Sequence, residues 1–187
     1  GMDLYFARHD GQAVCTEDFV NAMSAAADFD FDQFSLWYSQ RGTPTVEVSS
    51  MYDQEDQSYT LTFAQKSSYS NEDQQKPFLI PIQLALFNAH GNEVPLSNKE
   101  GEPEETILLS SQQQTVTYQN IKEKPIPSIL RNFSAPVILN YDYKDNELAV
   151  LSAYDTDPFN RWESSQRLAL KTILINIDRI QRKILPD

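Results

Sequence analysis

Apolar and polar residues alternate with a period of two through the middle of the chain. The alternating positions are Val46 and Val48; Tyr59, Leu61 and Phe63; Phe78, Ile80, Ile82, Leu84 and Leu86; Val116 and Tyr118; and Val137, Leu139 and Tyr141. β-branched and aromatic residues at this spacing are typical of strands buried on one face. Shorter candidate strands lie at 92–96 and 105–110. About seven short strands in about 100 residues predict an antiparallel β-sandwich.

Polar and proline-rich segments separate these strands. Residues 66–76 predict a polar surface loop, and residues 97–101 predict a turn. Because Pro81 interrupts the strongest alternating run, we expect that strand to lie at a sheet edge or to carry a bulge. Three prolines within 121–136 predict an extended crossing segment without a regular element.

Before the alternating region, residues 1–43 have a helical pattern after a short lead-in. Thr16 is a candidate N-cap, because Glu17 and Asp18 follow it where the helix dipole favours acids. A second short helix is expected to begin near Asp30 or Asp32 and to end before Gly42.

Residues 144–187 again predict helices. Asp145 is expected to cap a short helix over 147–153, and Asp157-Pro158 is a strong helix start. The second helix carries an apolar stripe about four turns long, which a soluble protein must bury. The residues of the stripe are Leu170, Ile173, Leu174, Ile177, Ile180 and Ile184. Without a partner domain, we therefore expect this helix either to fold back on the sandwich or to drive self-association.

The composition excludes several classes of function. The net charge of -12 argues against binding to nucleic acid or to an anionic membrane surface. The isolated glycines form no phosphate-binding loop, and no apolar stretch is long enough to cross a membrane. One cysteine and no recognisable signal peptide fit a reducing, cytosolic environment.

Candidate chemistry is sparse. His9 and His90 are 81 positions apart and form no zinc motif, so we expect no metal, cofactor or catalytic residue in this chain. His90 is expected in a hairpin turn. A thiol at a helix N-terminus can be acidic, but Cys15 is more simply a small buried residue. Acidic clusters are expected to be solvated caps and loops. Trp37 and Trp162 lie beside the two changes of pattern, so we expect them to pack between domains.

Five strings along the chain resemble the bacterial aminopeptidase N family in order and spacing. They are LYFARHDG at 4–11, EDFVNAM at 17–23, FSLWYSQRGTP at 34–44, PIPSILRNFSAPV at 125–137 and DPFNRWE at 157–163. The family consists of cytosolic zinc aminopeptidases with a thermolysin-like catalytic domain. The family's zinc-binding motif and substrate-anchoring motif have no match in this chain, so the resemblance assigns it no catalytic residue.

The resemblance implies a non-catalytic fragment of such an enzyme. Residues 1–43 would be the helical tail of the catalytic domain, 44–143 a complete immunoglobulin-like sandwich, and 144–187 the first helices of the C-terminal domain. The implied fold is mainly β, with a sandwich between two short helical segments. Zinc and the peptide substrate would belong to the parent enzyme, whose other domains would be the partners of this fragment. The sandwich would act as a structural spacer between them.

Two alternatives remain open from the sequence. A free-standing sandwich module could bind peptide or carbohydrate on a sheet edge or a tyrosine face. A small hydrolase could use an unrecognised pair of acids, for which the acidic clusters at Asp28, Asp30 and Asp32 and at Glu102, Glu104 and Glu105 are the candidates.

Overall fold

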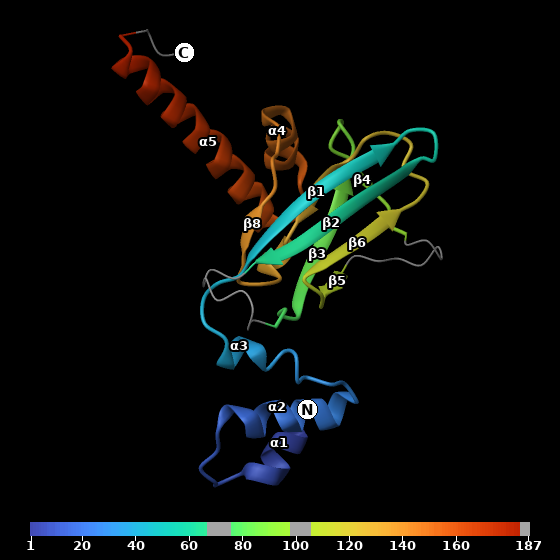
Figure 1. The fold of residues 1–187 in the computed structure, drawn as a ribbon, viewed down its shortest axis with the longest axis vertical. Helices are drawn as coiled ribbons and strands as arrows, with labels where there is room; N and C mark the ends of the chain where they lie inside the picture. The colour runs from blue at the N-terminus through green and yellow to red at the C-terminus, as the bar shows by residue number, and fades with distance from the viewer. Residues whose placement is uncertain (67–75, 98–105, 184–187) are drawn as a thin grey trace.

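The protein is described by a computed structural model that covers residues 1–66, 76–97 and 106–183. The helices are α1 (Met2–His9), α2 (Thr16–Ala27), α3 (Leu36–Ser39), η2 (Arg131–Phe133), α4 (Asp145–Tyr154) and α5 (Pro158–Gln181). The strands are β1 (Thr45–Asp53), β2 (Ser58–Lys66), β3 (Ile80–Phe87), β4 (Glu93–Val94), β5 (Thr106–Leu109), β6 (Gln113–Tyr118), β7 (Ile126–Ile129) and β8 (Ile138–Asn140). Figure 1 shows the strands in the centre, α1 and α2 at one end, and α5 projecting from the other.

The strands form two sheets that enclose one apolar core. The first sheet has the order β6-β2-β1-β8, and the second has the order β4-β3-β5 with β7 paired to β3. Tyr59, Leu61 and Phe63 of β2 face Ile80, Ile82 and other inward residues of β3 within a single cluster of buried side chains. The predicted sandwich between helical segments is therefore confirmed, and the alternating pattern had identified its inward face.

β3 departs from simple alternation in its second half. In the first half, buried Ile80 and Ile82 alternate with partly buried Pro81 and Gln83. In the second half, every residue from Leu84 to Phe87 is buried. The reason is a second apolar cluster on the outer face of the sheet, where Ala85 and Phe87 pack with Leu151 of α4. The outward positions of β3 are thus apolar only where a helix covers them.

Two of the strand predictions need correction. The sandwich is not purely antiparallel, because β8 pairs with β1 in parallel, with Ile138 opposite Thr45. β3 is a central strand and not an edge strand, since it pairs with β5 on one side and with β4 and β7 further along. Pro81 is tolerated because the half of β3 that contains it pairs with β5 alone, opposite Leu108.

The proline-rich segment is more regular than predicted. Residues 126–129 form β7, which pairs antiparallel with Leu84–Phe87 of β3. A sharp corner follows, with Leu130, Asn132 and Phe133 all at positive φ. The predicted loop at 66–76 and the predicted turn at 97–101 lie, apart from their ends, outside the described residues.

The N-terminal helices also differ from the prediction. The predicted lead-in is itself a helix, α1, and α2 is capped by Cys15, with Thr16 as its first helical residue. The Asp18 carboxylate accepts a hydrogen bond from the backbone N–H of Cys15, at 2.9 Å, and so completes a capping box. The predicted second helix shrinks to the four residues of α3, preceded by turns.

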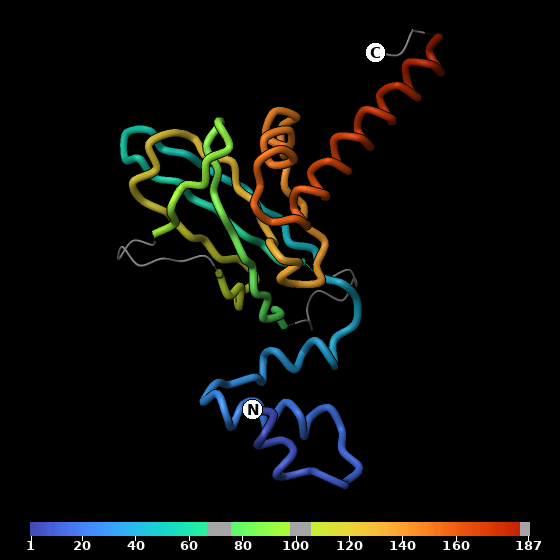
Figure 2. Tube along the Cα trace, turned by 180° about the vertical axis from the view of Figure 1, so that it is seen from behind, coloured from blue at the N-terminus to red at the C-terminus, as the bar shows by residue number. Residues whose placement is uncertain are grey.

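The C-terminal helices α4 and α5 lie beside the sandwich, and α5 extends away from it (Figures 1 and 2). α4 is capped by Lys144, and not by Asp145, because Glu147 bonds back to the N–H of Lys144 at 2.9 Å. The predicted start at Asp157-Pro158 is confirmed, since the Asp157 side chain accepts a hydrogen bond from the N–H of Asn160. α5 is 24 residues long, so this helical segment is not short.

Candidate interdomain interfaces

The segment before and through α3 contacts the start of β3 through side chains that bind backbone groups. We call residues 33–40 and their contacts with 76–79 the N-terminal interface. Gln33 donates to the carbonyl of Pro77 at 3.0 Å, and the indole N–H of Trp37 donates to the carbonyl of Leu79 at 2.9 Å. Gln33 lies in the turns before α3 and Trp37 lies in α3, and both side chains reach the same extended segment.

Gln40 makes the most specific contact of the N-terminal interface. Its Nε2 donates to the carbonyl of Lys76, and its Oε1 accepts from the N–H of the same residue, both at 2.9 Å. One amide side chain thereby replaces the strand partner that the backbone of Lys76 lacks at this point. Gln40 is nevertheless only half-buried and Lys76 is exposed, so water competes with both hydrogen bonds.

Trp37 joins the N-terminal interface to the sandwich core. Its ring lies 4.7 Å from the ring of Phe78, and it packs against the main buried cluster. The backbone of Phe78 is held from the inside by buried Gln65, which accepts from its N–H at 2.7 Å and donates to its carbonyl at 3.0 Å. The segment at 76–79 is therefore bound by side chains on both of its faces.

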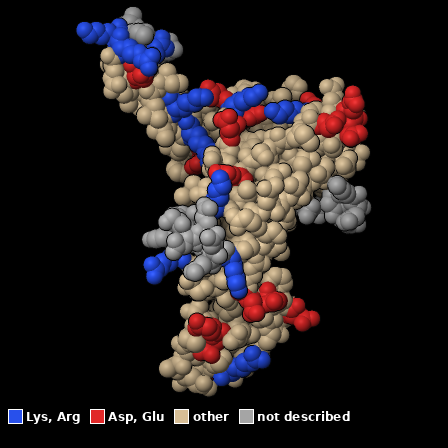
Figure 3. All heavy atoms as spheres, viewed as in Figure 1, with Lys and Arg blue, Asp and Glu red and all other residues tan. Residues whose placement is uncertain are grey.

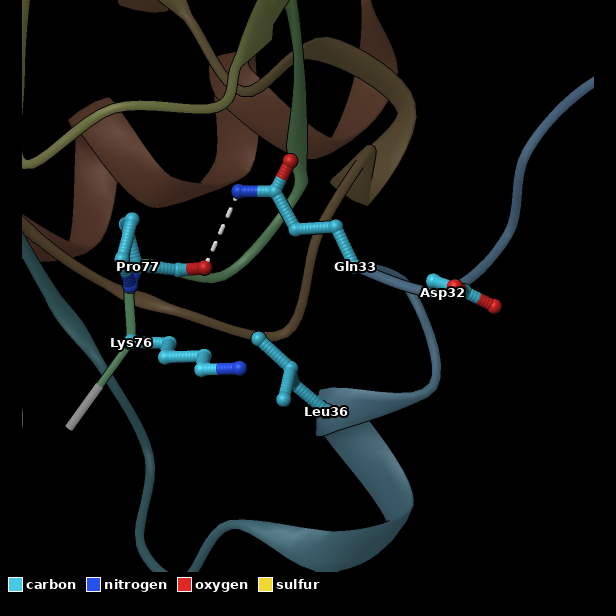
Figure 4. Close-up of a pocket in the computed structure, with 5 residues that line it drawn as sticks. All are labelled: Asp32, Gln33, Leu36, Lys76 and Pro77. Atoms are coloured by element: carbon cyan, nitrogen blue, oxygen red, sulfur yellow. Dashed lines mark hydrogen bonds between the residues drawn. The ribbon is translucent and has the colours of Figure 1, made fainter.

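A cavity of about 270 Å³ lies within the N-terminal interface, lined by Asp32, Gln33, Leu36, Lys76 and Pro77. Figure 4 shows the Lys76 side chain extending toward Leu36, with the hydrogen bond from Gln33 to Pro77 above it. The Asp32 carboxylate points away from the other four side chains in the same view. The packing of α3 on the sandwich is thus incomplete on this side.

The turn between α4 and α5 is attached to β7 by buried polar groups. We call the contacts of residues 155–160 with residues 128–132 the C-terminal interface. The Asn160 side chain donates to Ser128 Oγ at 2.7 Å and to the carbonyl of Ile129 at 3.0 Å. Ser128 in turn donates to the Asp155 carboxylate at 2.5 Å. Asn160 is 7% exposed and Asp155 is 1% exposed, so these hydrogen bonds are made away from water.

Charged groups complete the C-terminal interface. Asp157, the cap of α5, also accepts from the N–H of Asn132 at 3.0 Å and so binds the corner after β7. Arg131 from this corner lies 3.6 Å from Asp155 and 3.5 Å from Glu93 of β4, and it also donates to Thr156. These contacts join β4, the corner and the start of α5.

Burial dominates the titration of Asp155. Loss of water raises the pKa of its carboxyl group above the ordinary value, while the Ser128 hydroxyl, the Asp157 N–H and the Arg131 charge act in the opposite direction. Nearby, the Tyr143 hydroxyl donates to the carbonyl of Pro127 at 2.7 Å, and desolvation also raises the pKa of that hydroxyl. The C-terminal interface is therefore a desolvated polar network.

The residues singled out by sequence lie at different depths. Trp37 is in the N-terminal interface, whereas Trp162 on α5 is 55% exposed and contacts Phe159 at a ring distance of 5.9 Å. Their packing between domains stays a prediction. His90 lies in the turn between β3 and β4, as predicted, and His9 ends α1. Glu102, Glu104 and Glu105 lie outside the described residues.

Cys15 is exposed, so the prediction of a small buried residue was wrong, and its thiol is not acidic. The backbone N–H of Asp18 lowers its pKa, but hydrogen bonds to the carboxylates of Asp18 and Glu17 outweigh this, so the pKa is raised. Within 1–66, 76–97 and 106–183, no group of three or more His, Cys, Asp or Glu residues could hold a metal ion. The zinc chemistry implied by the family resemblance therefore has no fitting residues in the described part of this chain.

Sequence reasoning missed the residues that carry both interfaces. Gln33, Gln40, Ser128 and Asn160 are common polar residues, and only their position opposite a backbone segment gives them a role. The sequence offered one signal for Asn160: it lies three residues after the N-cap Asp157 and therefore in the first turn of α5. Gln33 and Gln40 had no comparable local signal.

α5 exposes its apolar stripe beyond the contact with α4. Leu170, Ile173, Leu174, Ile177 and Ile180 are between 46% and 59% exposed. Figure 3 shows basic side chains near the far end of α5 and acidic side chains on the N-terminal helices and at the tip of the β1–β2 hairpin. In the described residues, no helix is both long enough and apolar enough to cross a bilayer.

The sequence of this sandwich and of the helices after it matches known protein families. A family model described as a domain of unknown function (DUF3458) with an Ig-like fold matches residues 42–142. The chain belongs to this family. A second model, described as DUF3458_C with ARM repeats, matches residues 145–186.

Curated relatives are named aminopeptidase N. The chain is 39% identical to aminopeptidase N of Escherichia coli (strain K12) over 97% of its length and 21% of the relative's. It is 37% identical to that of Haemophilus influenzae over 97% of this chain and 21% of the relative, and 41% identical to that of Caulobacter vibrioides over 93% and 20%. The chain thus corresponds to a segment of aminopeptidase N and spans about a fifth of the length of these relatives.

A solved structure agrees with this match. The crystal structure of Legionella pneumophila aminopeptidase A in complex with aspartic acid superposes with a TM-score of 0.77 at 28% identity, covering 94% of this chain and 19% of that one. The resemblance to aminopeptidase N is therefore confirmed by sequence and by fold.

Proposed function

We propose that this chain is a non-catalytic segment of a cytosolic, zinc-dependent aminopeptidase that removes N-terminal residues from peptides. The sandwich acts as a structural spacer between the peptidase part and a helical C-terminal part of the same protein. The observation that carries this proposal is the match over nearly the whole chain to a fifth of aminopeptidase N. Zinc, the general base and the anchor for the substrate would all come from the remainder of the parent.

The two interfaces support a spacer role. A spacer must fix the orientation of the elements at its ends, because small displacements at a reaction centre reduce the rate. At the N-terminal end, Trp37 and Gln40 bind the backbone that leads into β3. At the C-terminal end, Asn160 and Ser128 connect α5 to β7 through buried hydrogen bonds. Both contacts fix direction as well as distance, since hydrogen bonds depend on angle.

The apolar face of α5 supports the predicted helical partner. ARM-type helices bury their apolar faces by stacking on neighbouring helices, and a single pair leaves one face uncovered. The match of residues 145–186 to ARM repeats and the exposed stripe of α5 fit that situation. Further helices of the parent would cover this face.

The test is an assay of the full-length parent with the spacer weakened at one interface. Asn160→Ala should lower peptidase kcat/KM while the zinc content stays at the wild-type level, because the metal site itself is untouched. Gln166→Ala, an exposed change on the same helix, should leave kcat/KM unchanged. Wild-type kcat/KM in a folded Asn160→Ala parent would contradict the spacer role.

A second test uses the chain alone. The isolated chain should neither hydrolyse a chromogenic amino-acid amide nor bind stoichiometric zinc. Its α5 helix should drive self-association, which Ile177→Glu abolishes. Turnover of peptides by the isolated chain, or a clean monomer with the stripe intact, would oppose the corresponding part of the proposal. Saturable binding of a peptide or sugar would favour the free-standing module instead.

A further inference from the structure

The segment that connects α2 to the N-terminal interface makes only local hydrogen bonds among the described residues, although Asp32 at its end lines the cavity beside Lys76. Phe29 exchanges hydrogen bonds with Ser24, and Asp32 bonds back to the Asp30 carboxylate at 2.8 Å. In the described ranges, the hydrogen bonds of residues 29–32 join positions no more than five apart. By contrast, the Gln33 side chain donates to the carbonyls of Pro77 and Ser110, which are 44 and 77 positions away in the sandwich.

α1 and α2 form a small unit on the other side of this segment. Tyr5 of α1 packs edge-on against Phe19 of α2 at a ring distance of 5.3 Å, and Val20 and Ala22 are buried. Both figures of the backbone show this helix pair set apart from the sandwich, with α3 between them (Figures 1 and 2). The ring contacts of residues 1–28 within the described ranges likewise stay inside this pair.

The backbone changes direction at the start of the segment. α2 ends at Asp28 in the left-handed conformation, with φ of 50°, so the helix does not run on into residues 29–32. Three aromatic rings follow, and Phe29–Phe31 and Phe31–Phe34 are in edge contact at 4.9 Å and 5.8 Å. These ring pairs stiffen the segment locally, but they do not connect it to the sandwich.

We propose that residues 29–32 form a hinge about which the α1–α2 pair moves as one body relative to the sandwich with its α3, α4 and α5 helices. Hinges are short segments between packed units, whose backbone absorbs a change of orientation at the cost of few contacts. The contacts broken by bending here are local, whereas bending at residues 33–40 would break hydrogen bonds to Lys76, Pro77 and Leu79. The spacer is then rigid from residue 33 onward and jointed before it.

This inference concerns the chain itself, and only its consequence for a peptidase rests on the proposed function. If residues 1–28 are attached to the peptidase part of a parent, the hinge alone permits that part to change its angle to the sandwich. The proposed spacer role then requires that other contacts within the parent hold this angle. A peptidase assay tests the proposed function, whereas a distance distribution tests the hinge, so either can fail without the other.

The test is a set of pulsed electron–electron distance measurements on nitroxide-labelled chains. One label sits on Cys15, the single cysteine of the chain, and a second on Ser49→Cys in β1, which is exposed. Two control pairs are labelled in a chain that carries Cys15→Ser. The first, Ser49→Cys with Gln166→Cys, measures from the sandwich to α5. The second, Ala7→Cys with Ala25→Cys, measures within the α1–α2 pair. A chain that also carries Ile177→Glu keeps the samples monomeric.

The hinge predicts that the distribution from Cys15 to Ser49→Cys is about twice as wide as both control distributions. Phe31→Ser, which removes both ring contacts, should widen it further and leave the controls unchanged. Equal widths for all three pairs would overturn the hinge. A broad distribution inside the α1–α2 pair would also overturn it, because the pair would then not move as one body.

Discussion

The two interfaces attach helical segments to the same sandwich by different physical means. The N-terminal interface uses an aromatic ring and the amides of Gln33 and Gln40, which are in contact with water, around an unfilled cavity. The C-terminal interface uses buried Ser128, Asp155 and Asn160, whose hydrogen bonds are shielded. A buried hydrogen bond costs more to break than an exposed one, because the groups left behind are not solvated. The two kinds of contact therefore give the two interfaces unequal stiffness.

The largest effect is expected from Asn160→Ala. The change leaves the buried carbonyl of Ile129 without this donor, deprives Ser128 Oγ of another and opens a small void. We expect the free energy of unfolding to fall by about 3 kcal/mol. Urea unfolding followed by circular dichroism measures this loss. Gln166→Ala on the same helix should cost less than about 0.5 kcal/mol, and a similar loss for both would remove the basis of the comparison.

Trp37→Ala should have the next largest effect. It removes the ring that packs on Phe78 and the hydrogen bond to Leu79, and because Trp37 is only partly buried we expect a loss of about 2 kcal/mol. Trp162→Ala is the matched control, since that ring is largely exposed and should cost about 0.5 kcal/mol. An equal loss in the free energy of unfolding for both substitutions would show that burial of the ring does not determine its contribution to stability.

The sequence predicted the sandwich well because its core follows a local rule. In β2 and β3 apolar residues recur at every second position, and those residues, such as Leu61 and Phe63 of β2 and Ile82 of β3, lie on the inward face. The interfaces could not be predicted in this way, because Gln40 meets Lys76 and Asn160 meets Ser128 only after the chain has folded back over 36 and 32 positions. A polar residue that satisfies a distant backbone group looks, in sequence, like any surface residue.

The same limit explains the errors at the strands. The parallel pairing of β8 with β1 joins residues far apart in sequence, and no local pattern encodes the direction of a partner strand. Proline at positions 125, 127 and 136 suggested an irregular segment, but β7 pairs with β3 alone, and Pro127 is tolerated at this outer strand. Tertiary pairing thus overrode the local preference.

Asp155 should make the C-terminal interface sensitive to pH in a defined direction. Its folded-state pKa is raised by burial, so between the ordinary carboxyl pKa and the raised value the folded state binds more protons than the unfolded state. The free energy of unfolding should therefore decrease as the pH rises through that window. Asp155→Asn should lose this component, whereas Asp142→Asn at an exposed site should keep it. Parallel stability–pH curves for the wild type and Asp155→Asn would contradict the assignment.

The smallest effect is expected from Gln40→Ala, although it removes two hydrogen bonds of good length. Lys76 is exposed and Gln40 is only half-buried, so after truncation water can solvate the N–H and the carbonyl of Lys76. We expect a loss of less than about 1 kcal/mol, together with faster hydrogen exchange at the Lys76 amide. The amide of Asn160, which bonds to Asp157 at the other interface, should exchange at the wild-type rate. Gln54→Ala in the β1–β2 turn is the control for removing an exposed glutamine. If Gln40→Ala destabilised the chain as much as Asn160→Ala, exposure would not be the property that distinguishes the two interfaces.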